Sequence, residues 1–145
     1  KYQIIHLVGK GLLNKDINVE GYNQYEFLSA ELFDIFKIVD FTISRAGANA
    51  LYEFLALNIP AILVPLGTNQ SRGDQIENAK FFEKNGFALV FQEDDFKDLE
   101  LTKVDDFYNS LNDYKNAMIK YKDEKKVINN VEDFYNKILK EVGGK

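Results

Sequence analysis

The segment Asp40-Phe-Thr-Ile-Ser-Arg-Ala-Gly-Ala-Asn-Ala-Leu-Tyr-Glu53 has the residue types of an anion-binding turn. A short apolar run ends at Ser44, Gly47 permits a tight turn, and a helical pattern begins near Ala48. The first N–H groups of a helix have no partner within it, and the helix dipole favours negative charge there. Small residues at 46–48 let a phosphate approach, and Glu53 is placed to reach a ribose diol beside it. The same spacing also fits an ordinary strand-to-helix turn with a surface glutamate.

A polar segment follows the next apolar run along the chain, between residues 65 and 78. Its side chains are mostly neutral amides and hydroxyls with one acid, which suits the hydroxyls of a sugar better than a metal ion. Asp74 is also a plausible N-cap for the helix that carries Ile76 and Ala79. That role explains Asp74 but not the whole set, which comprises Asn69, Gln70, Ser71, Arg72, Asp74, Gln75 and Asn78.

A third loop with chemical potential is His6-Leu-Val-Gly9-Lys10-Gly11, at the end of the first apolar run. Lys10 could approach an anion there. His6 is the only histidine, so no site with two histidine ligands exists, and a lone histidine in an apolar strand is typical of a satisfied core residue. Neither G-x-G-x-x-G nor G-x-x-x-x-G-K-[ST] occurs, which argues against NAD-binding and P-loop chemistry.

The composition places these segments in an ordinary globular domain. The chain has 145 residues, 46% of them hydrophobic, with twelve Phe and eight Tyr. A net charge of −5 argues against a nucleic-acid partner, and the absence of cysteine excludes disulfides and thiolate metal sites. No stretch approaches the roughly 20 apolar residues that span a bilayer. The chain begins at Lys1 with a strand-like run almost at once, so we expect a piece of a longer protein.

Short apolar runs alternate with helical patterns, which predicts an α/β fold with one parallel sheet of four or five strands. The first and fourth runs are nearly continuous in apolar residues, as in strands covered on both faces by helices. In such sheets ligands bind beyond the carboxyl ends of the strands, where the three polar loops lie. The expected strands are Gln3–Val8, Tyr22–Leu28, Phe41–Ser44, Ala61–Leu66 and Ala88–Phe91.

The character of the chain changes after Glu93. Val104, Leu111 and Met118 belong to amphipathic helical patterns, and a further pattern runs from Val127 to Val142. We therefore expect residues 1–95 to form an α/β portion that carries the three polar loops, and residues 96–145 to form a helical tail of the same domain.

The ordered set of motifs resembles the C-terminal domain of the MurG-type glycosyltransferases. The resemblance covers roughly residues 4–95 and rests on His6…Gly9-Lys-Gly11, on Ser44-Arg-Ala-Gly-Ala48 with Glu53, on Pro60-Ala-Ile-Leu-Val-Pro-Leu66, and on Ser71-Arg-Gly-Asp-Gln75 with Asn78 and Phe82-Glu-Lys-Asn-Gly86. It implies a Rossmann-like domain of the two-domain GT-B fold and a hexosyltransferase. The implied reaction is inverting transfer of N-acetylglucosamine from UDP-N-acetylglucosamine to an undecaprenyl-diphosphate-linked muramoyl-pentapeptide in peptidoglycan synthesis.

The resemblance also implies roles for individual residues in donor binding. Glu53 would bind the ribose hydroxyls, Asp74 and Gln75 would contact the sugar, and the uracil would lie near Leu28 and Ser29. Ala48, Asn49 and Ala50 would face the diphosphate, and Arg45, Gly47 and Asn78 complete the expected donor site. No cofactor or metal is implied, because helix dipoles and backbone donors can hold the leaving diphosphate.

The chain departs from that family pattern in ways that limit what it can do. Ala50 replaces a threonine found in some members, and Asp74-Gln75 replaces a pair of glutamines. The Gly-Gly-Ser loop and the acceptor-binding N-terminal domain are missing, so we expect no catalytic residue and no transfer by this chain alone. The resemblance places the enzyme at the cytoplasmic face of the bacterial inner membrane, with the lipid-linked acceptor and the peripheral membrane contact reached through the missing domain. An alternative is a small nucleotide-sugar-binding subunit of a split polysaccharide glycosyltransferase.

Overall fold

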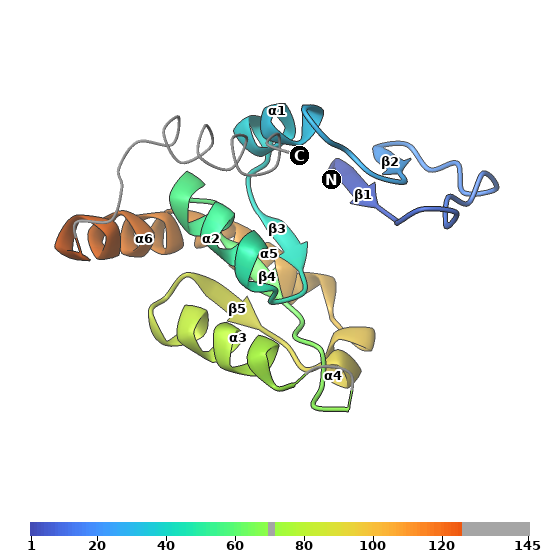
Figure 1. Cartoon of the computed structure of the whole chain (residues 1–145). Helices are drawn as coiled ribbons and strands as arrows, with labels where there is room; N and C mark the ends of the chain where they lie inside the picture. The colour runs from blue at the N-terminus through green and yellow to red at the C-terminus, as the bar shows by residue number, and fades with distance from the viewer. Residues whose placement is uncertain (70–71, 126–145) are drawn as a thin grey trace, which may run out of the picture. The chain divides into compact units, whose positions relative to one another are not determined.

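The computed structural model describes residues 1–69 and 72–125. The chain divides into two compact units, Lys1–Ile38 and Val39–Lys145 (Figure 1). The expected helical pattern from Val127 to Val142 lies outside the described residues, as do Gln70 and Ser71. None of the helices within the described ranges has the length and apolar character needed to cross a bilayer.

The first unit contains two strands and one helix. Strands β1 (Ile4–Leu7) and β2 (Tyr22–Tyr25) pair in parallel, and helix α1 (Glu31–Ile38) follows. The connection from residue 8 to residue 21 forms turns instead of a crossover helix, so neither face of this small sheet is covered within the unit. Ile4 is therefore 49% and Leu7 44% exposed, and the expectation that β1 is buried on both faces is wrong.

His6 also differs from its expected place in a core. It is exposed on β1, and its Nδ1 lies 2.7 Å from the hydroxyl oxygen of Tyr22. The imidazole is thus satisfied by a side chain of the neighbouring strand rather than by burial.

The second unit is built on the three-stranded sheet β3 (Thr42–Ser44), β4 (Ala61–Leu63) and β5 (Ala88–Val90), in that order. All its pairings are parallel, with Ile43 opposite Ile62 and Ile62 opposite Leu89. The prediction of parallel strands is confirmed, but the strands form sheets of two and three members instead of the single sheet expected. In the described ranges, backbone pairing joins β1 to β2 and, separately, β3 to β4 and β4 to β5.

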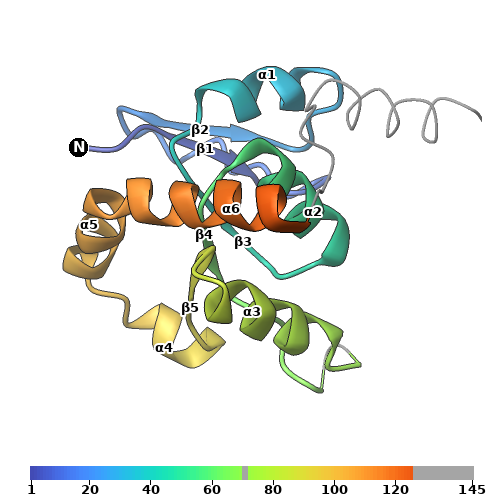
Figure 2. The ribbon, with the colours of Figure 1, turned by 90° about the vertical axis from the view of Figure 1, so that its left-hand side faces the viewer.

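Helices cover both faces of this three-stranded sheet. In Figures 1 and 2, α2 (Ala48–Leu57) and α3 (Asp74–Lys84) lie on one side, and α4 (Glu93–Lys97) and α5 (Leu101–Asn109) on the other. Helix α6 (Leu111–Lys125) packs at the end where the strands begin, since Tyr121 contacts Phe87 with ring centroids 5.2 Å apart. The expected helices at Val104–Met118 are confirmed as α5 and α6. Polar groups at the opposite end of the sheet are free to form a site.

The core lies between the sheet and these helices. Ile62, Leu63, Phe87 and Met118 have no exposed surface, and α2 buries Leu51, Phe54 and Leu55 on one stripe. This is the periodicity that the sequence predicts for a helix packed on a sheet. Burial of this stripe fixes α2 against β3 and β4, which sets where its first turn points.

Candidate functional site

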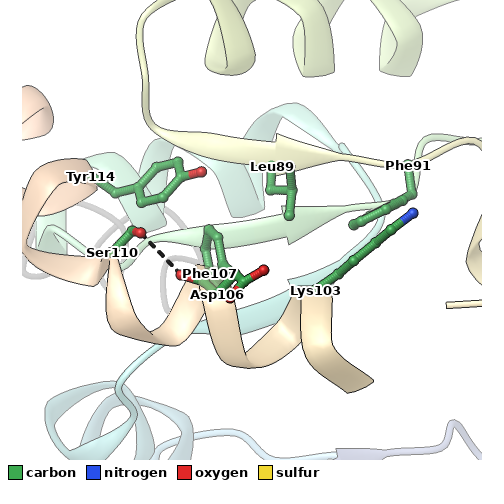
Figure 3. A pocket seen from close by; sticks show the side chains of 7 residues that line it. All are labelled: Leu89, Phe91, Lys103, Asp106, Phe107, Ser110 and Tyr114. Carbon is green, nitrogen blue, oxygen red and sulfur yellow. Dashed lines mark hydrogen bonds between the residues drawn. The ribbon is translucent and has the colours of Figure 1, made fainter. Parts of the chain in front are cut away.

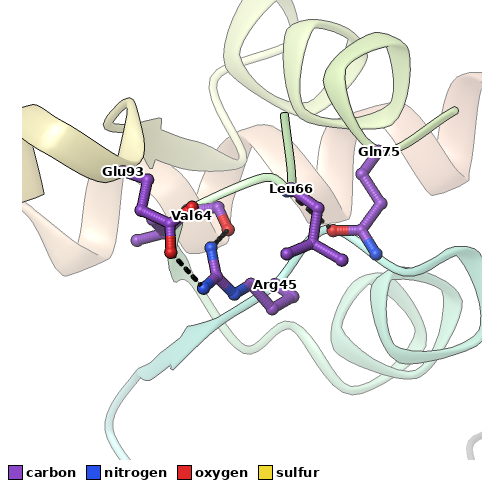
Figure 4. A network of polar contacts seen from close by, with 5 residues as sticks. All are labelled: Arg45, Val64, Leu66, Gln75 and Glu93. Atoms are coloured by element: carbon purple, nitrogen blue, oxygen red, sulfur yellow. Dashed lines mark hydrogen bonds and ion pairs between the residues drawn. The ribbon is translucent and has the colours of Figure 1, made fainter. Parts of the chain in front are cut away.

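The carboxyl ends of β3, β4 and β5 come together at one edge of the sheet. β3 is followed by Arg45, β4 by Val64 and β5 by Glu93 after a short link. Arg45 joins all three, because Nη1 donates to the Val64 carbonyl at 3.1 Å and Nη2 donates to Glu93 Oε1 at 2.8 Å (Figure 4). The pair is nearly half-exposed, so it adds little stability but fixes the relative positions of the loops.

Arg45 was expected to bind the donor, and its guanidinium is instead partly engaged within the chain. Two of its five N–H donors have partners in Val64 and Glu93, and the other three have none among the residues that the structure describes. An open depression of about 310 Å³ lies beside it, lined by Ile43, Ser44, Arg45, Val64, Glu93 and Phe96. Nothing in the sequence pattern indicated Glu93 as a partner, since it lies 48 residues further along the chain.

Helix α2 begins at this edge and presents an open first turn. Its N-cap is Gly47, with φ −70° and ψ 138°, and within the described part of the chain this cap position provides no side-chain hydrogen bond. The first helical hydrogen bond runs from the Leu51 N–H to the Gly47 carbonyl, so the N–H groups of the preceding residues have no partner within the helix. A Cβ added at Gly47 would meet no atom within 4 Å. The backbone beside the first turn of α2 is therefore open at Gly47, and the N–H groups of Ala48, Asn49 and Ala50 that follow it are of the kind that bind anions.

Glu53 lies in the second turn of α2 and is half-buried. Burial raises the pKa of its carboxyl group above the usual range. In the part of the chain that the structure describes, Glu53 takes part in no ion pair or hydrogen bond with another residue. A partly desolvated carboxylate without a structural partner is what a diol-binding group requires.

Helix α3 is hydrogen-bonded to the loops that follow β3 and β4. Its N-cap is Gly73, in the left-handed region at φ 86°, and Asp74 is the first helical residue. The prediction that Asp74 is the N-cap is therefore wrong by one position, because the turn needs the positive φ that glycine adopts without strain. Asp74 is exposed in the first turn, where its charge complements the helix dipole.

Two amides of α3 bind the backbone of these loops. Gln75 Oε1 accepts a hydrogen bond from the Leu66 N–H at 3.0 Å (Figure 4). Asn78 Nδ2 donates to the Ala46 carbonyl at 3.0 Å. The structure therefore brings the start of α3 next to the β3–α2 turn and to the loop after β4. Ser71, the remaining member of the polar segment in the family pattern, lies outside the described residues.

Leu28 and Ser29 belong to the first unit, where they lie between β2 and α1. Leu28 is half-buried and Ser29 is exposed. The Ser29 N–H and hydroxyl donate to Glu31 Oε2 at 3.3 and 3.4 Å. The pKa of Glu31 lies below its usual range because its own backbone N–H and that of Ser29 stabilise the carboxylate.

In the glycine-containing loop after β1, a backbone N–H group is hydrogen-bonded to a carboxylate of the chain itself. Gly9 and Gly11 adopt φ of 92° and 77°, and the Gly11 N–H donates to Glu26 Oε1 at 2.8 Å. Lys10 is exposed. The carboxylate of Glu26 thus accepts from a backbone N–H group that the sequence pattern predicts to be available to a ligand.

A larger depression of about 390 Å³ lies away from the predicted residues. It is lined by β5 and the helices α5 and α6, as Figure 3 shows, through Leu89, Phe91, Lys103, Asp106, Phe107, Ser110 and Tyr114. Burial, with the nearby charges of Asp113 and Glu83, raises the pKa of Tyr114. Among the described residues, no group of three or more histidine, aspartate or glutamate side chains is arranged to hold a metal ion.

Comparison with known proteins places this geometry in context. Residues 1–138 match the model of the glycosyltransferase family 28 C-terminal domain. Three relatives carry the name UDP-N-acetylglucosamine--N-acetylmuramyl-(pentapeptide) pyrophosphoryl-undecaprenol N-acetylglucosamine transferase, the last with the suffix 2. The chain is 60% identical to the protein from Staphylococcus carnosus over 65% of the chain and 26% of that relative. It is 46% identical to the protein from Staphylococcus haemolyticus over 97% of the chain and 39% of that relative. It is also 46% identical to the protein from Bacillus cereus, over 92% of the chain and 39% of that relative. The chain therefore spans less than two fifths of the length of these relatives.

Proposed function

The chain belongs to glycosyltransferase family 28 as its C-terminal domain, and on that basis we propose that it binds the UDP-N-acetylglucosamine donor of a hexosyltransferase. The reaction is transfer of N-acetylglucosamine to a muramoyl-pentapeptide carried on undecaprenyl diphosphate. The names of the relatives support this substrate pair. The acceptor and the membrane surface are reached by parts of the longer protein outside this chain, at the cytoplasmic face of the membrane.

The observation that carries the proposal is the open first turn of α2 with Glu53 one turn behind it. The diphosphate accepts from the N–H groups of Ala48, Asn49 and Ala50, which follow the open position at Gly47 in the first turn of α2. Glu53 accepts from the ribose hydroxyls. Since the developing charge of the leaving UDP lies on the same diphosphate, the turn stabilises the transition state as well as the bound donor.

The direct test replaces Glu53 by Gln in the full-length protein that carries this chain. Glutamine keeps the shape but removes the charge, and hydrogen bonds to a charged group contribute about 1.5–3 kcal/mol. We expect UDP affinity to fall by roughly 10- to 150-fold in calorimetry, and Glu53→Ala to lose at least as much. Glu124→Gln on α6 removes the same charge from an exposed position and should leave the affinity unchanged.

The raised pKa of Glu53 gives the test a second signature. Binding needs the carboxylate, so affinity for UDP-N-acetylglucosamine should fall as the pH drops through the raised pKa, and Glu53→Gln should abolish that dependence. The sugar nucleotide is the better probe, because a terminal phosphate titrates by itself near pH 6, at about its second pKa. A raised folded-state pKa contributes stability only below the unfolded value, and the contribution is lost as pH rises through the folded pKa. Glu53→Gln should therefore be no less stable than the wild type at pH 7. Equal affinities of wild type and variant would remove Glu53 from the site.

A further inference from the structure

The connection between β1 and β2 carries a group of exposed aliphatic side chains. Leu12 is 68% exposed, Leu13 40%, Ile17 43% and Val19 60%. Every residue from 10 to 20 is exposed, and Figure 1 shows the connection extending past the ends of both strands. Single apolar side chains on a surface need no explanation, whereas a group of them so close in sequence indicates contact with something apolar.

The backbone on both sides of the pair Leu12–Leu13 is held by polar side chains of β2 and of the residue after it. Glu26 Oε1 accepts from the Gly11 N–H at 2.8 Å. Gln24 binds the backbone of Asn14 twice, because its Oε1 accepts from the N–H at 3.1 Å and its Nε2 donates to the carbonyl at 3.0 Å. Gln24 and Glu26 are themselves half-buried. The two leucines are therefore displayed on a fixed backbone, so less conformational entropy is lost when they meet a partner.

Two lysines flank the exposed leucines. Lys10 precedes the pair Leu12–Leu13 by two positions and Lys15 follows it by two, and both lysines are exposed. The acids of the connection, Asp16 and Glu20, come after this stretch. A lysine lays its aliphatic stem along an apolar surface while its ammonium group stays in the polar layer. Apolar side chains between lysines have the chemistry of a segment that lies in the interface of an anionic bilayer.

We propose that the β1–β2 connection touches an anionic membrane, with Leu12 and Leu13 in the boundary layer below the headgroups and Lys10 and Lys15 at the lipid phosphates. A protein partner fits less well. The cores of protein interfaces are enriched in aromatic residues and arginine and depleted in lysine, and residues 9–20 contain no aromatic residue and no arginine.

The inference rests on the proposed function, whose acceptor is carried on an undecaprenyl chain, and adds to it a membrane contact within this chain. Two leucines and two lysines supply only weak and reversible binding. The contact therefore orients the protein at the surface where the acceptor lies and does not anchor it there.

The first experiment places a reporter in the connection of the full-length protein that carries this chain. Leu12→Trp keeps an apolar side chain, and its emission is taken as the difference from the wild type. We expect this emission to move to shorter wavelength with phosphatidylglycerol vesicles and to be quenched by lipids brominated on the acyl chains. The signal comes from the connection itself, so membrane contacts of the rest of the protein do not produce it. Leu101→Trp, at a 60% exposed position at the start of α5, is the control and should show neither change.

The second experiment measures the strength of the contact by co-sedimentation with the same vesicles. We expect the partition coefficient to fall by about tenfold when Leu12 and Leu13 are both replaced by serine. Lys10→Gln should weaken binding by about fivefold on phosphatidylglycerol and not on phosphatidylcholine, and high salt should remove this loss. The melting temperature without vesicles and the affinity for UDP should stay unchanged in all these variants.

The outcomes separate this inference from the proposed function. Emission from Leu12→Trp that vesicles do not change, or a double serine variant that partitions like the wild type, would overturn the membrane contact. A lower melting temperature of the double serine variant without vesicles would also overturn it, because the leucines would then pack against another part of the longer protein. Calorimetry of the wild type with UDP tests the proposed function separately, since it needs no vesicles and no change in the β1–β2 connection.

Discussion

Replacing Gly47 by alanine should separate binding from folding more sharply than any change of a charged residue. Gly47 has φ −70° and ψ 138°, which alanine adopts without strain, and the added Cβ would meet no atom within 4 Å. Such a Gly→Ala change reduces the freedom of the unfolded chain and stabilises by about 0.4–1 kcal/mol. Gly47 is also the N-cap of α2, where alanine is the poorer residue by about 1 kcal/mol, so the two effects nearly cancel and the fold gives little reason for glycine at this position.

The ligand does give a reason, because the new methyl group would occupy the space in front of the first turn of α2. A diphosphate pushed away from one backbone N–H loses a charge-assisted hydrogen bond of about 1.5–3 kcal/mol. We expect UDP affinity to fall by roughly 10- to 150-fold while the free energy of unfolding changes by no more than about 1 kcal/mol. Calorimetry with UDP and urea unfolding on the same preparation measure the two quantities.

Gly86 provides the matched control for this experiment. It has φ 72°, at the end of α3 away from the site, and an added Cβ would lie 3.6 Å from the Cβ of Ala117. Gly86→Ala should cost about 1–2 kcal/mol of stability, because a side chain is strained in that region, and should leave UDP affinity unchanged. If Gly47→Ala bound UDP as tightly as the wild type, the phosphate would not lie at the first turn of α2.

Two further predictions concern the opposite end of α2. Lys122 is 5% exposed and its Nζ donates to the Ala56 carbonyl at 3.0 Å, so Lys122→Met should lower stability by about 1–3 kcal/mol in urea unfolding by leaving that carbonyl unpaired. Burial lowers the pKa of Lys122 in the folded protein, so the unfolded chain binds more protons between that lowered pKa and 10.5. The stability of the wild type relative to Lys122→Met should therefore rise with pH in this range. A stability difference that does not change with pH would refute the account. Asn58 ends α2 at φ 54° with its Oδ1 buried and without a hydrogen-bond partner in the described chain. Asn58→Gly removes a penalty of about 1–3 kcal/mol against a glycine cost of about 0.5–1 kcal/mol, so urea unfolding should show a gain in stability, and a loss would mean that Oδ1 is satisfied.

The sequence predicts the strands of the second unit and its helices α2, α3, α5 and α6 because each has a strong local signal, whereas it does not predict the short helix α4. The continuous apolar run at Ala61–Leu63 forms the buried central strand, and the spacing of Leu51, Phe54 and Leu55 gives the buried stripe of α2. Asn58 before Ile59-Pro60 correctly marks the end of that helix. The strands themselves are shorter than predicted, because the backbone pairing covers fewer residues than the apolar runs do.

The first unit shows that an apolar sequence pattern does not by itself determine whether a strand is buried. The residues of β1 are those of a buried strand, yet burial depends on which element packs against them, and no crossover helix forms between β1 and β2. The same holds for the polar residues of the site. The residue types at Arg45, Gln75 and Asn78 point to ligand contacts, but their partners Glu93, Leu66 and Ala46 are brought near by the tertiary fold. Composition and spacing identify the loop, whereas the direction of each hydrogen bond needs the structure.

The two ends of α2 are treated differently by the rest of the chain, and this asymmetry argues for a ligand at its start. At its end, Lys122 donates to the Ala56 carbonyl, and the backbone N–H groups of Asn58 and Ile59 donate to the last turn. At its start, the N-cap is a glycine that provides no side-chain bond and leaves free space. An N-cap of serine, threonine, aspartate or asparagine stabilises a helix by about 0.5–2 kcal/mol relative to alanine. The serine nearest to Gly47 in sequence, Ser44, does not serve as the N-cap and donates its hydroxyl to the Arg45 carbonyl. Among the described residues, α2 is thus closed at its carboxyl end and open at its amino end, and this openness supports the proposed diphosphate site, because a diphosphate has the charge and the oxygens to accept from the N–H groups of the first turn.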